Sequence, residues 1–278
     1  MAIKCNFDIV NFLTKYIMKR YPNKYNFTHP NQKYSLQCIL QSILFILKTG
    51  MSLNDFEIIG KINKKTLYNH LKFFMENEIF KLAYIEILNK YFKFNKCQKL
   101  KFQSIDSSFI PNQYGIENIG RNKYYKNKKG YKLSLITDVN GIPFSLLVEK
   151  GSKNDAKMID DHLNNLLIVT NSNQYRNHNR YKQYLLGDKM YDTKEFREKV
   201  TNKGYSCIID YNKRNTKDVN KIKKLKKKEK YKYKKRIIIE NCFSWLKKNK
   251  RIKEINEKKM SAYISFVYLA LIKKFFIN

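Results

Sequence analysis

One stretch decides the interpretation of this sequence, and it reads Tyr233-Lys-Lys-Arg236-Ile-Ile-Ile-Glu240-Asn-Cys-Phe-Ser-Trp245-Leu-Lys247. Wound as an α-helix with about 100° per residue, the stretch places four of its polar side chains within an arc of about 60°. These side chains are Tyr233, Arg236, Glu240 and Lys247. Apolar side chains take most of the opposite side, with Ile237 as the exception: Ile238, Ile239, Cys242, Phe243, Trp245 and Leu246. The pattern predicts an amphipathic helix whose other face presents one carboxylate between two cations and a phenol.

A polar face of this kind is most often a solvated surface with ordinary salt bridges. The residues before it, however, predict a sheet that brings partners for the glutamate. Tyr131–Asp138 and Ile142–Glu149 alternate around an Asn-Gly pair, which predicts a β-hairpin. The other predicted strands are Lys101–Asp106, Tyr184–Asp188 and Tyr205–Asp210, and the helices predicted between them are Met158–Leu167 and Thr193–Asn202. This order indicates an α/β fold with a mixed sheet flanked by helices.

Two aspartates end strands of this predicted sheet. Asp106 and Asp188 each follow an apolar run, and Glu240 lies on a later helix. Functional groups gather at the carboxyl ends of strands in such sheets, and three converging carboxylates repel one another unless a cation is present. Hard oxygen ligands without histidine or cysteine favour Mg²⁺ or Mn²⁺. Two such ions about 4 Å apart support in-line phosphoryl transfer, and the neighbouring Arg236, Lys247 and Tyr233 would then hold DNA phosphates.

Taken singly, each of these carboxylates is weak support, because an aspartate at a strand end is usually a turn or cap residue. Three other aspartates near predicted strand ends are most simply explained as turn or cap residues. Asp138 suits the hairpin turn, Asp155 suits the N-cap of the following helix, and Asp192 suits a turn.

The composition restricts the partner and the compartment. A formal charge of +34 over 278 residues indicates a polyanion such as DNA, RNA or an anionic membrane surface. Part of this charge accompanies a general richness in Lys, Asn and Ile, so charge alone does not identify nucleic acid as the partner. The five cysteines are scattered, which excludes a zinc site and fits a reducing compartment. The longest apolar run, Ala262–Ile272, is too short to cross a bilayer. We expect a soluble, DNA-associated protein without a membrane partner, in the cytoplasm or nucleoid, or in a nucleus or viral factory.

Residues 1–97 predict an all-helical N-terminal region. Ser35 is a plausible N-cap of a helix that Gly50 ends. Two short helical patterns follow, Ser52–Ile59 and Asn63–Phe73, separated by a glycine turn. They fit a helix-turn-helix that presents Lys64 and Lys65 to a major groove. They fit equally a plain helical hairpin with exposed lysines, in which Leu67, Leu71 and Phe74 pack.

The motifs resemble a known family. The spacing of Tyr233, Arg236, Glu240 and Lys247 resembles the Y-R-E-K signature of the DDE transposases of bacterial insertion sequences, in the group similar to insertion sequences four and five. Ile105–Ser108 resembles the first-aspartate strand of that family, and Gly187–Asp192 its second-aspartate motif. The stretches after the first aspartate are also similar: Lys129–Leu133, Asp138–Pro143 and Gly151–Asp155.

The resemblance implies a ribonuclease H-like catalytic domain over residues 98–278, with a basic loop at 220–236 and C-terminal helices. It implies a metal triad of Asp106, Asp188 and Glu240 holding two ions, Mg²⁺ or Mn²⁺. The implied activity is cleavage of DNA at element ends followed by strand transfer to target DNA, by a homodimer on paired ends. The expected DNA contacts are Tyr233, Arg236, Lys247, Lys64, Lys65 and Lys132. The interval from Asp188 to Glu240 is too short for the large β-rich insertion of some relatives, which argues against a hairpin intermediate.

Two other functions fit the same residues. A domesticated or inactive relative would bind DNA through its charge and its helical region, without any chemistry. A metal-dependent nuclease on the same core would hydrolyse nucleic acid without joining strands. Assays for metal dependence and for strand transfer separate the three.

Overall fold

The computed structural model describes residues 2–25, 33–60, 62–168, 182–212 and 224–276. These residues form two compact units. The helical unit comprises Met1–Ile87, Pro111–Glu117 and Leu246–Asn278, and the sheet unit comprises Leu88–Ile110 and Asn118–Trp245. The predicted domains, 1–97 and 98–278, follow sequence order, whereas the compact units do not. The functional boundary between domains therefore stays a prediction.

The helical unit confirms the helical N-terminal region. Its helices are α1 (Ala2–Arg20), α2 (Pro22–Tyr25), α3 (Leu36–Thr49), α4 (Leu53–Ile59), α5 (Lys64–Glu76), α6 (Ile79–Tyr91, whose end belongs to the sheet unit), α13 (Lys250–Lys253) and α14 (Met260–Lys274). As predicted, Ser35 caps α3, with its hydroxyl accepting from the Cys38 N–H at 3.2 Å. Gly50 ends the helix in the left-handed region, at a φ of 74°.

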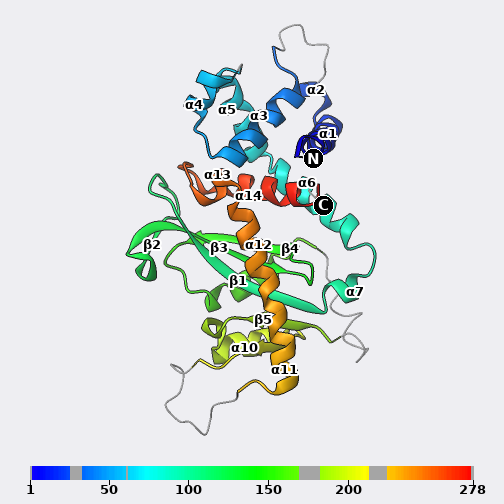
Figure 1. Cartoon of the computed structure of the whole chain (residues 1–278), viewed down its shortest axis with the longest axis vertical. Coiled ribbons are helices and arrows are strands. Elements are labelled where there is room, and N and C mark those ends of the chain that lie inside the picture. Colours follow the sequence, from blue (N-terminus) through cyan, green and yellow to red (C-terminus); the bar gives the residue numbers. More distant parts are fainter. Residues whose placement is uncertain (1, 26–32, 61, 169–181, 213–223, 277–278) are drawn as a thin grey trace. The chain divides into compact units, whose positions relative to one another are not determined.

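The strands of the sheet unit are β1 (Phe102–Pro111, whose last residue belongs to the helical unit), β2 (Gly120–Asn122), β3 (Lys128–Thr137), β4 (Pro143–Lys150), β5 (Tyr184–Gly187) and β6 (Ser206–Ile209). The strand order is β2–β3–β1–β5–β6, and β4 also pairs with β3. Parallel pairing joins β1 to β5 and β5 to β6, whereas β3 runs antiparallel to β2 and β4. This is the predicted mixed, ribonuclease H-like sheet, and β3 and β4 form the predicted hairpin (Figure 1).

The sheet unit also contains the helices and 3-10 turns that carry the loops. They are α7 (Lys96–Lys99), η1 (Lys123–Tyr125), η2 (Ala156–Met158), α8 (Ile159–Asn164), η4 (Lys189–Tyr191), α10 (Lys194–Asn202), α11 (Lys227–Tyr233), η6 (Lys234–Arg236) and α12 (Ile237–Lys247, whose last two residues belong to the helical unit). On α12 the predicted apolar face is confirmed: Ile239, Cys242, Phe243 and Leu246 are buried, while Ile237 is 53% exposed.

Strand β1 is longer than the sequence predicts. The alternation of apolar residues fades at Ser107 and Ser108, so the strand was expected to end at Asp106. Instead it continues to Pro111, with Phe109 and Ile110 buried. The backbone of β3 packs closely against this second half of β1, because a Cβ added to Gly130 would lie 2.3 Å from the Ile110 carbonyl oxygen. Asp106 is therefore an interior strand residue, and the prediction that it ends the strand is wrong.

The predicted basic loop at 220–236 is also wrong over its described part, because Lys227–Tyr233 forms α11 and Lys234–Arg236 forms a 3-10 turn. Residues 220–223 lie outside the described residues. Lysine favours helix, and Glu229 accepts from the Lys226 N–H at 2.8 Å to cap the first turn. The lysines also rest on aromatic rings: Lys232 lies 4.0 Å from the Tyr184 ring centroid and Lys235 lies 5.1 Å from that of Phe102.

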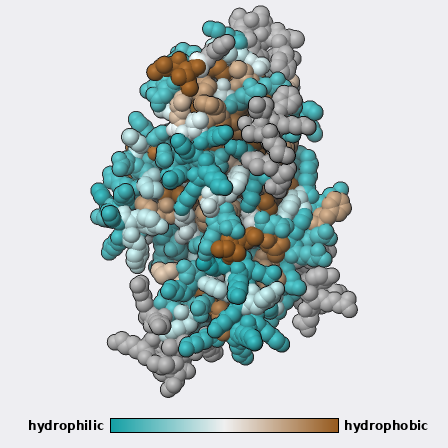
Figure 2. All heavy atoms as spheres, in the orientation of Figure 1, coloured by the Kyte–Doolittle hydropathy of each residue, from teal (hydrophilic) through white to brown (hydrophobic). Residues whose placement is uncertain are grey.

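The surface shown in Figure 2 is mostly hydrophilic, as the charged composition leads one to expect. Within the described residues, no single helix is both long and apolar enough to cross a membrane. Helices α3 and α4 reach that length and composition only when counted together, and they are bent by 119° relative to each other.

Candidate active site

The sheet brings the first two predicted carboxylates together. Strands β1 and β5 pair in parallel up to Ser104 and Leu186. Continued two residues further, this register places Asp106 beside Asp188. Asp188 opens the turn η4, but its side chain makes no capping hydrogen bond there. Burial raises the pKa of the Asp106 carboxyl, and the charge of Asp188 raises it further, so the two side chains share one electrostatic environment.

Arg236 connects the third carboxylate to this pair. Its Nη1 donates to Asp106 Oδ2 at 3.2 Å, and its Nη2 donates to Glu240 Oε1 one helical turn further on. The side chain of Arg236 is 18% exposed. Burial lowers the pKa of Arg236, but the net shift is upward because of four neighbouring side chains: Asp106, Tyr233, Glu240 and Asp188. The Tyr233 ring centroid lies 5.9 Å from the guanidinium carbon. Of the polar helix face predicted from the sequence, Arg236 therefore contacts Asp106 directly, while Glu240 and Tyr233 lie beside its guanidinium.

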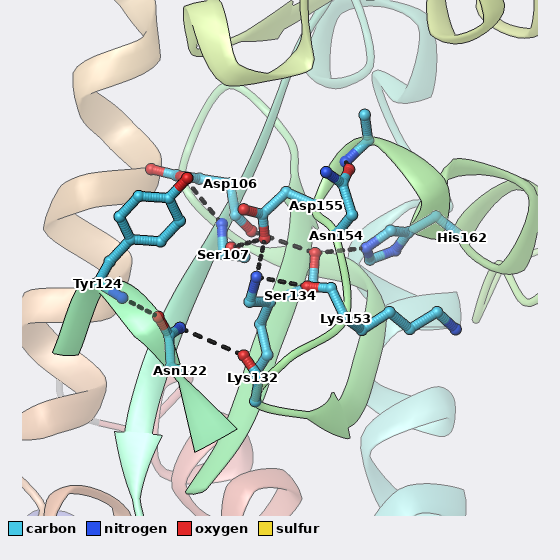
Figure 3. Close-up of polar contacts among 12 residues, drawn as sticks. Asp106, Ser107, Asn122, Tyr124, Lys132, Ser134, Lys153, Asn154, Asp155 and His162 are labelled. Atoms are coloured by element: carbon cyan, nitrogen blue, oxygen red, sulfur yellow. Dashed lines mark hydrogen bonds and ion pairs between the residues drawn. The ribbon is translucent and has the colours of Figure 1, made fainter. Parts of the chain in front are cut away.

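A fourth carboxylate, Asp155, belongs to the same cluster (Figure 3). The predicted N-cap role of Asp155 is wrong: its side chain makes no cap hydrogen bond, and Asn154 Oδ1 instead accepts from the Ala156 N–H at 2.9 Å. Asp155 Oδ1 accepts from the Ser107 hydroxyl and lies 3.0 Å from Lys132 Nζ. Both partners come from the central strands β1 and β3, so tertiary pairing takes this carboxylate away from its own helix.

The electrostatics of the cluster favour a proton or a cation at Asp106. The pKa of Asp106 is raised to about 6, chiefly by burial and further by the Asp188 and Asp155 charges. The Ser107 N–H, which donates to Asp106 Oδ1 at 2.8 Å, and the Arg236 guanidinium lower the pKa and offset part of the rise. A further positive charge would be stabilised here.

The carboxylates line a cavity of about 370 Å³ in the sheet unit. Asp106, Asp155 and Asp188 belong to its wall, together with the basic and aromatic residues Arg121, Lys123, Tyr124, Tyr125 and Lys132. A volume of this size lies in the range of small-molecule and nucleotide sites. The cavity wall thus combines acidic, basic and aromatic side chains.

The donor set suits a hard divalent cation, because it consists of carboxylate oxygens. Among the described residues, however, no three His, Cys, Asp or Glu side chains are arranged to hold a metal ion. Arg236 supplies the positive charge between Asp106 and Glu240. Metal binding by both carboxylates would therefore require the guanidinium to move.

Two rival aspartates have structural partners, and for Asp138 this is the hairpin-turn role that the sequence predicts. Buried Asp138 accepts from the Asn140 and Ile142 N–H groups of the hairpin turn and from the Tyr91 hydroxyl. Asp192 pairs with Arg197 at 2.7 Å and accepts from the Asn212 N–H.

The remaining predicted DNA contacts lie in different surroundings. Lys132 is only 8% exposed, and its ammonium is engaged by Asp155 and the Lys153 carbonyl, so it is not presented to solvent. Lys64 and Lys65 are exposed at the start of α5 in the helical unit. Lys247 ends α12 and also belongs to the helical unit. Contacts of Lys64, Lys65 and Lys247 with DNA stay predictions.

Residues 98–272 match a family model described as Transposase DDE domain. The chain belongs to this family. The match extends over more than half of the chain and includes Asp106, Asp188 and Glu240.

Solved structures similar to this transposase chain are remote. One is the Mos1 strand transfer complex, at 13% identity, covering 68% of this chain and 63% of that chain, with a TM-score of 0.25. Another is the Mos1 mariner paired end complex with Mn, at 10% identity, covering 84% of this chain and 87% of that chain, with a TM-score of 0.26. The chain thus spans less than two thirds of the first of them. At such scores the likeness supports no argument. No curated protein matches the sequence.

Sequence reasoning missed the network behind the carboxylates of this transposase domain. The Ser134 hydroxyl lies 2.7 Å from His162 Nε2 and donates to the Asp106 carbonyl at 3.4 Å. His162 is fully buried, and burial lowers its pKa to about 3. One signal was available for Asp155, which ends one of the stretches that resemble the family. No local pattern marks Ser134 or His162.

Proposed function

We propose that this chain is a DNA transposase that cleaves DNA at the ends of a mobile element and joins the resulting 3′-hydroxyl strand to target DNA. One observation carries the proposal: Asp106 on β1 and Asp188, directly after the parallel neighbouring strand β5, share one cavity, and Arg236 joins Asp106 to Glu240. Within a transposase DDE domain, this arrangement supports the predicted catalytic triad.

The roles follow from charge and position. Asp106, Asp188 and Glu240 would hold Mg²⁺ or Mn²⁺, two ions in the full proposal, which when bound would activate the attacking oxygen and stabilise the leaving oxygen. Arg236, released from the carboxylates, would bind a DNA phosphate with its fork of donors. Tyr233 beside it would orient the strand, and Lys247 would contact a further phosphate. Asp155 and Lys132 would keep the Ser107 end of the site in place.

Strand nicking and joining test this proposal. The substrate is DNA carrying the inverted repeats that flank the gene, incubated with Mg²⁺. Wild-type protein should nick and join, while Asp188→Ala and Glu240→Gln should lose both steps by at least about a hundredfold. Glu198→Gln, an exposed carboxylate on α10, is the matched control and should act as wild type. Full activity of either site variant would show that the proposed triad is not required for catalysis.

One observation favours the alternative of a DNA-binding relative without chemistry. The described carboxylates are not arranged to hold a metal, and Arg236 occupies the position of a counter-cation. Metal-independent binding of the same DNA with no cleavage would support this alternative. Hydrolysis without joining would instead indicate the nuclease.

The finer assignments belong to the same proposal. The spacing of Tyr233, Arg236, Glu240 and Lys247 supports membership in the group similar to insertion sequences four and five. A homodimer would hold two element ends, and Lys64 and Lys65 at the start of α5 would contact end DNA. The charge of +34 supports a DNA-associated protein.

A further inference from the structure

The cavity at the carboxylates has an aromatic rim that the proposed triad does not use. The rim is the turn η1 between β2 and β3, where Tyr124 is 80% exposed and Tyr125 is 52% exposed. Both tyrosines line the same cavity as Asp106 and Asp188. Figure 3 shows Tyr124 drawn together with Asp106 and Ser107. A ring this exposed leaves one face available to a ligand.

The turn that carries these rings is anchored. Asn122, which is 7% exposed, accepts from the Tyr124 N–H at 3.0 Å and donates to the Gly151 carbonyl at 3.2 Å. The Tyr125 ring lies 4.9 Å from the ring of buried Phe109. Close packing continues beneath, because a Cβ on Gly151 would lie 2.6 Å from a Phe109 ring carbon. The exposed ring of Tyr124 is therefore presented by a fixed support.

The charges around the rim select the ligand. Arg121 and Lys123 precede the tyrosines in the chain and line the same cavity as the aspartates Asp106, Asp155 and Asp188. Cations attract phosphates, the aspartates repel them, and an aromatic face stacks on a base of any sequence. A base paired within a duplex has both faces covered by its neighbours, so only an unpaired base can stack on Tyr124.

We propose that this cavity is a subsite for an unpaired nucleotide of a DNA strand, with its base stacked on Tyr124 and its phosphates near Arg121 and Lys123. The subsite rests on the proposed function, since it names the form of DNA that the active site accepts. A strand that frays next to the cut would be held there while its phosphodiester meets the carboxylates.

Binding of single-stranded DNA tests the subsite. The probe is a fluorescent oligodeoxythymidylate of about twenty nucleotides, titrated by anisotropy without metal, with a duplex of the same length in parallel. Tyr124→Ala should weaken single-strand binding about tenfold and leave duplex binding within about twofold. Tyr124→Phe keeps the ring and should bind as wild type. Tyr231→Ala is the matched control, an exposed tyrosine near lysines on α11 and outside this cavity.

Photocrosslinking gives an independent measurement. An oligonucleotide with 5-iododeoxyuridine should crosslink to Tyr124 or Tyr125, as mapped by mass spectrometry. Unchanged single-strand binding of Tyr124→Ala, equal losses in Tyr124→Ala and Tyr124→Phe, or crosslinks confined to other residues would overturn the subsite. These assays need no cleavage, so an inactive protein that stacks the base would refute only the transposition proposal. An active protein without the Tyr124 effect would refute only the subsite.

Discussion

At the scale of single residues, Arg236 controls the charge of the site because it contacts Asp106 and Glu240 at once. Replacing it with glutamine removes one positive charge from a group of at least three carboxylates. We expect Arg236→Gln to bind Mg²⁺ more tightly, by about 1–2 kcal/mol or roughly tenfold, because the competing cation is lost. DNA cleavage should nevertheless fall, since the phosphate contact is lost too.

Calorimetric titration with MgCl₂ measures the first effect and the nicking assay measures the second. Arg236→Lys keeps the charge and is the matched control, with an affinity for Mg²⁺ near that of wild type. Weaker binding of Mg²⁺ by Arg236→Gln would show that the guanidinium does not stand in for a cation.

His162 gives the site a dependence of stability on pH. Burial keeps it neutral in the folded protein, with a pKa of about 3, while the unfolded chain protonates it below about 6.5. The unfolded state then binds more protons, so the free energy of unfolding rises with pH between about 3 and 6.5, by up to about 1.4 kcal/mol per unit. Stability is correspondingly lost as the pH falls. Urea unfolding at several pH values should show a shallower slope for His162→Gln, and equal slopes would contradict this account.

At the scale of elements, the sequence predicts what local chemistry determines. The Asn-Gly turn predicts the β3–β4 hairpin, and the caps Ser35 and Thr193 predict the starts of α3 and α10. The end of β1 could not be predicted, because Ser107 and Ser108 interrupt the apolar pattern and only pairing within the sheet keeps that segment extended. Asp155 was assigned to a cap for the same reason: its partners Ser107 and Lys132 are distant in sequence.

Gly130 tests whether close pairing of β3 with the end of β1 holds this element. A Cβ there would lie 2.3 Å from the Ile110 carbonyl oxygen, and backbone cannot yield easily. We expect Gly130→Ala to destabilise the sheet unit by about 2 kcal/mol or more. Gly187→Ala on β5 is the matched control, because its Cβ would meet only side chains, at 3.3 Å or more. Hydrogen exchange of the β1 and β3 amides measures the stability of both variants. Equal protection in Gly130→Ala and Gly187→Ala would contradict the close packing of Gly130 against the Ile110 carbonyl.

At the scale of the whole molecule, the two compact units are not continuous segments of the sequence. The helical unit includes Pro111–Glu117, which lies between strands in the sequence, and Leu246–Asn278 at the C-terminal end. The helical character of the N-terminal region was predicted, but the assembly of the unit depends on contacts across long sequence separations, which no local pattern encodes. The proposed triad of Asp106, Asp188 and Glu240 could be read from the sequence because each carboxylate lies in its own motif, whereas the buried ion pair that joins three segments of the helical unit has no such motif.

That pair is Arg251 and Glu257, which are 6% and 7% exposed and 2.6 Å apart between Nε and Oε1. Arg251 also donates to the Gly50 and Met51 carbonyls, and the Glu257 carbonyl accepts from Asn112 at 3.0 Å. Three separate segments of the helical unit thus meet at one ion pair. Glu257→Ala leaves a buried cation without its counter-charge and should cost the helical unit about 3–5 kcal/mol.

Hydrogen exchange separates this effect from general unfolding. Amides of α3 and α13 should lose protection in Glu257→Ala, while those of β3 and β5 in the sheet unit should keep it. Glu254→Ala, an exposed carboxylate three residues earlier, should change neither set. Replacing both partners, as Arg251→Met with Glu257→Leu, should restore part of the stability, because no unpaired buried charge remains. If the double variant is as unstable as Glu257→Ala, the loss comes from packing and not from the uncompensated charge.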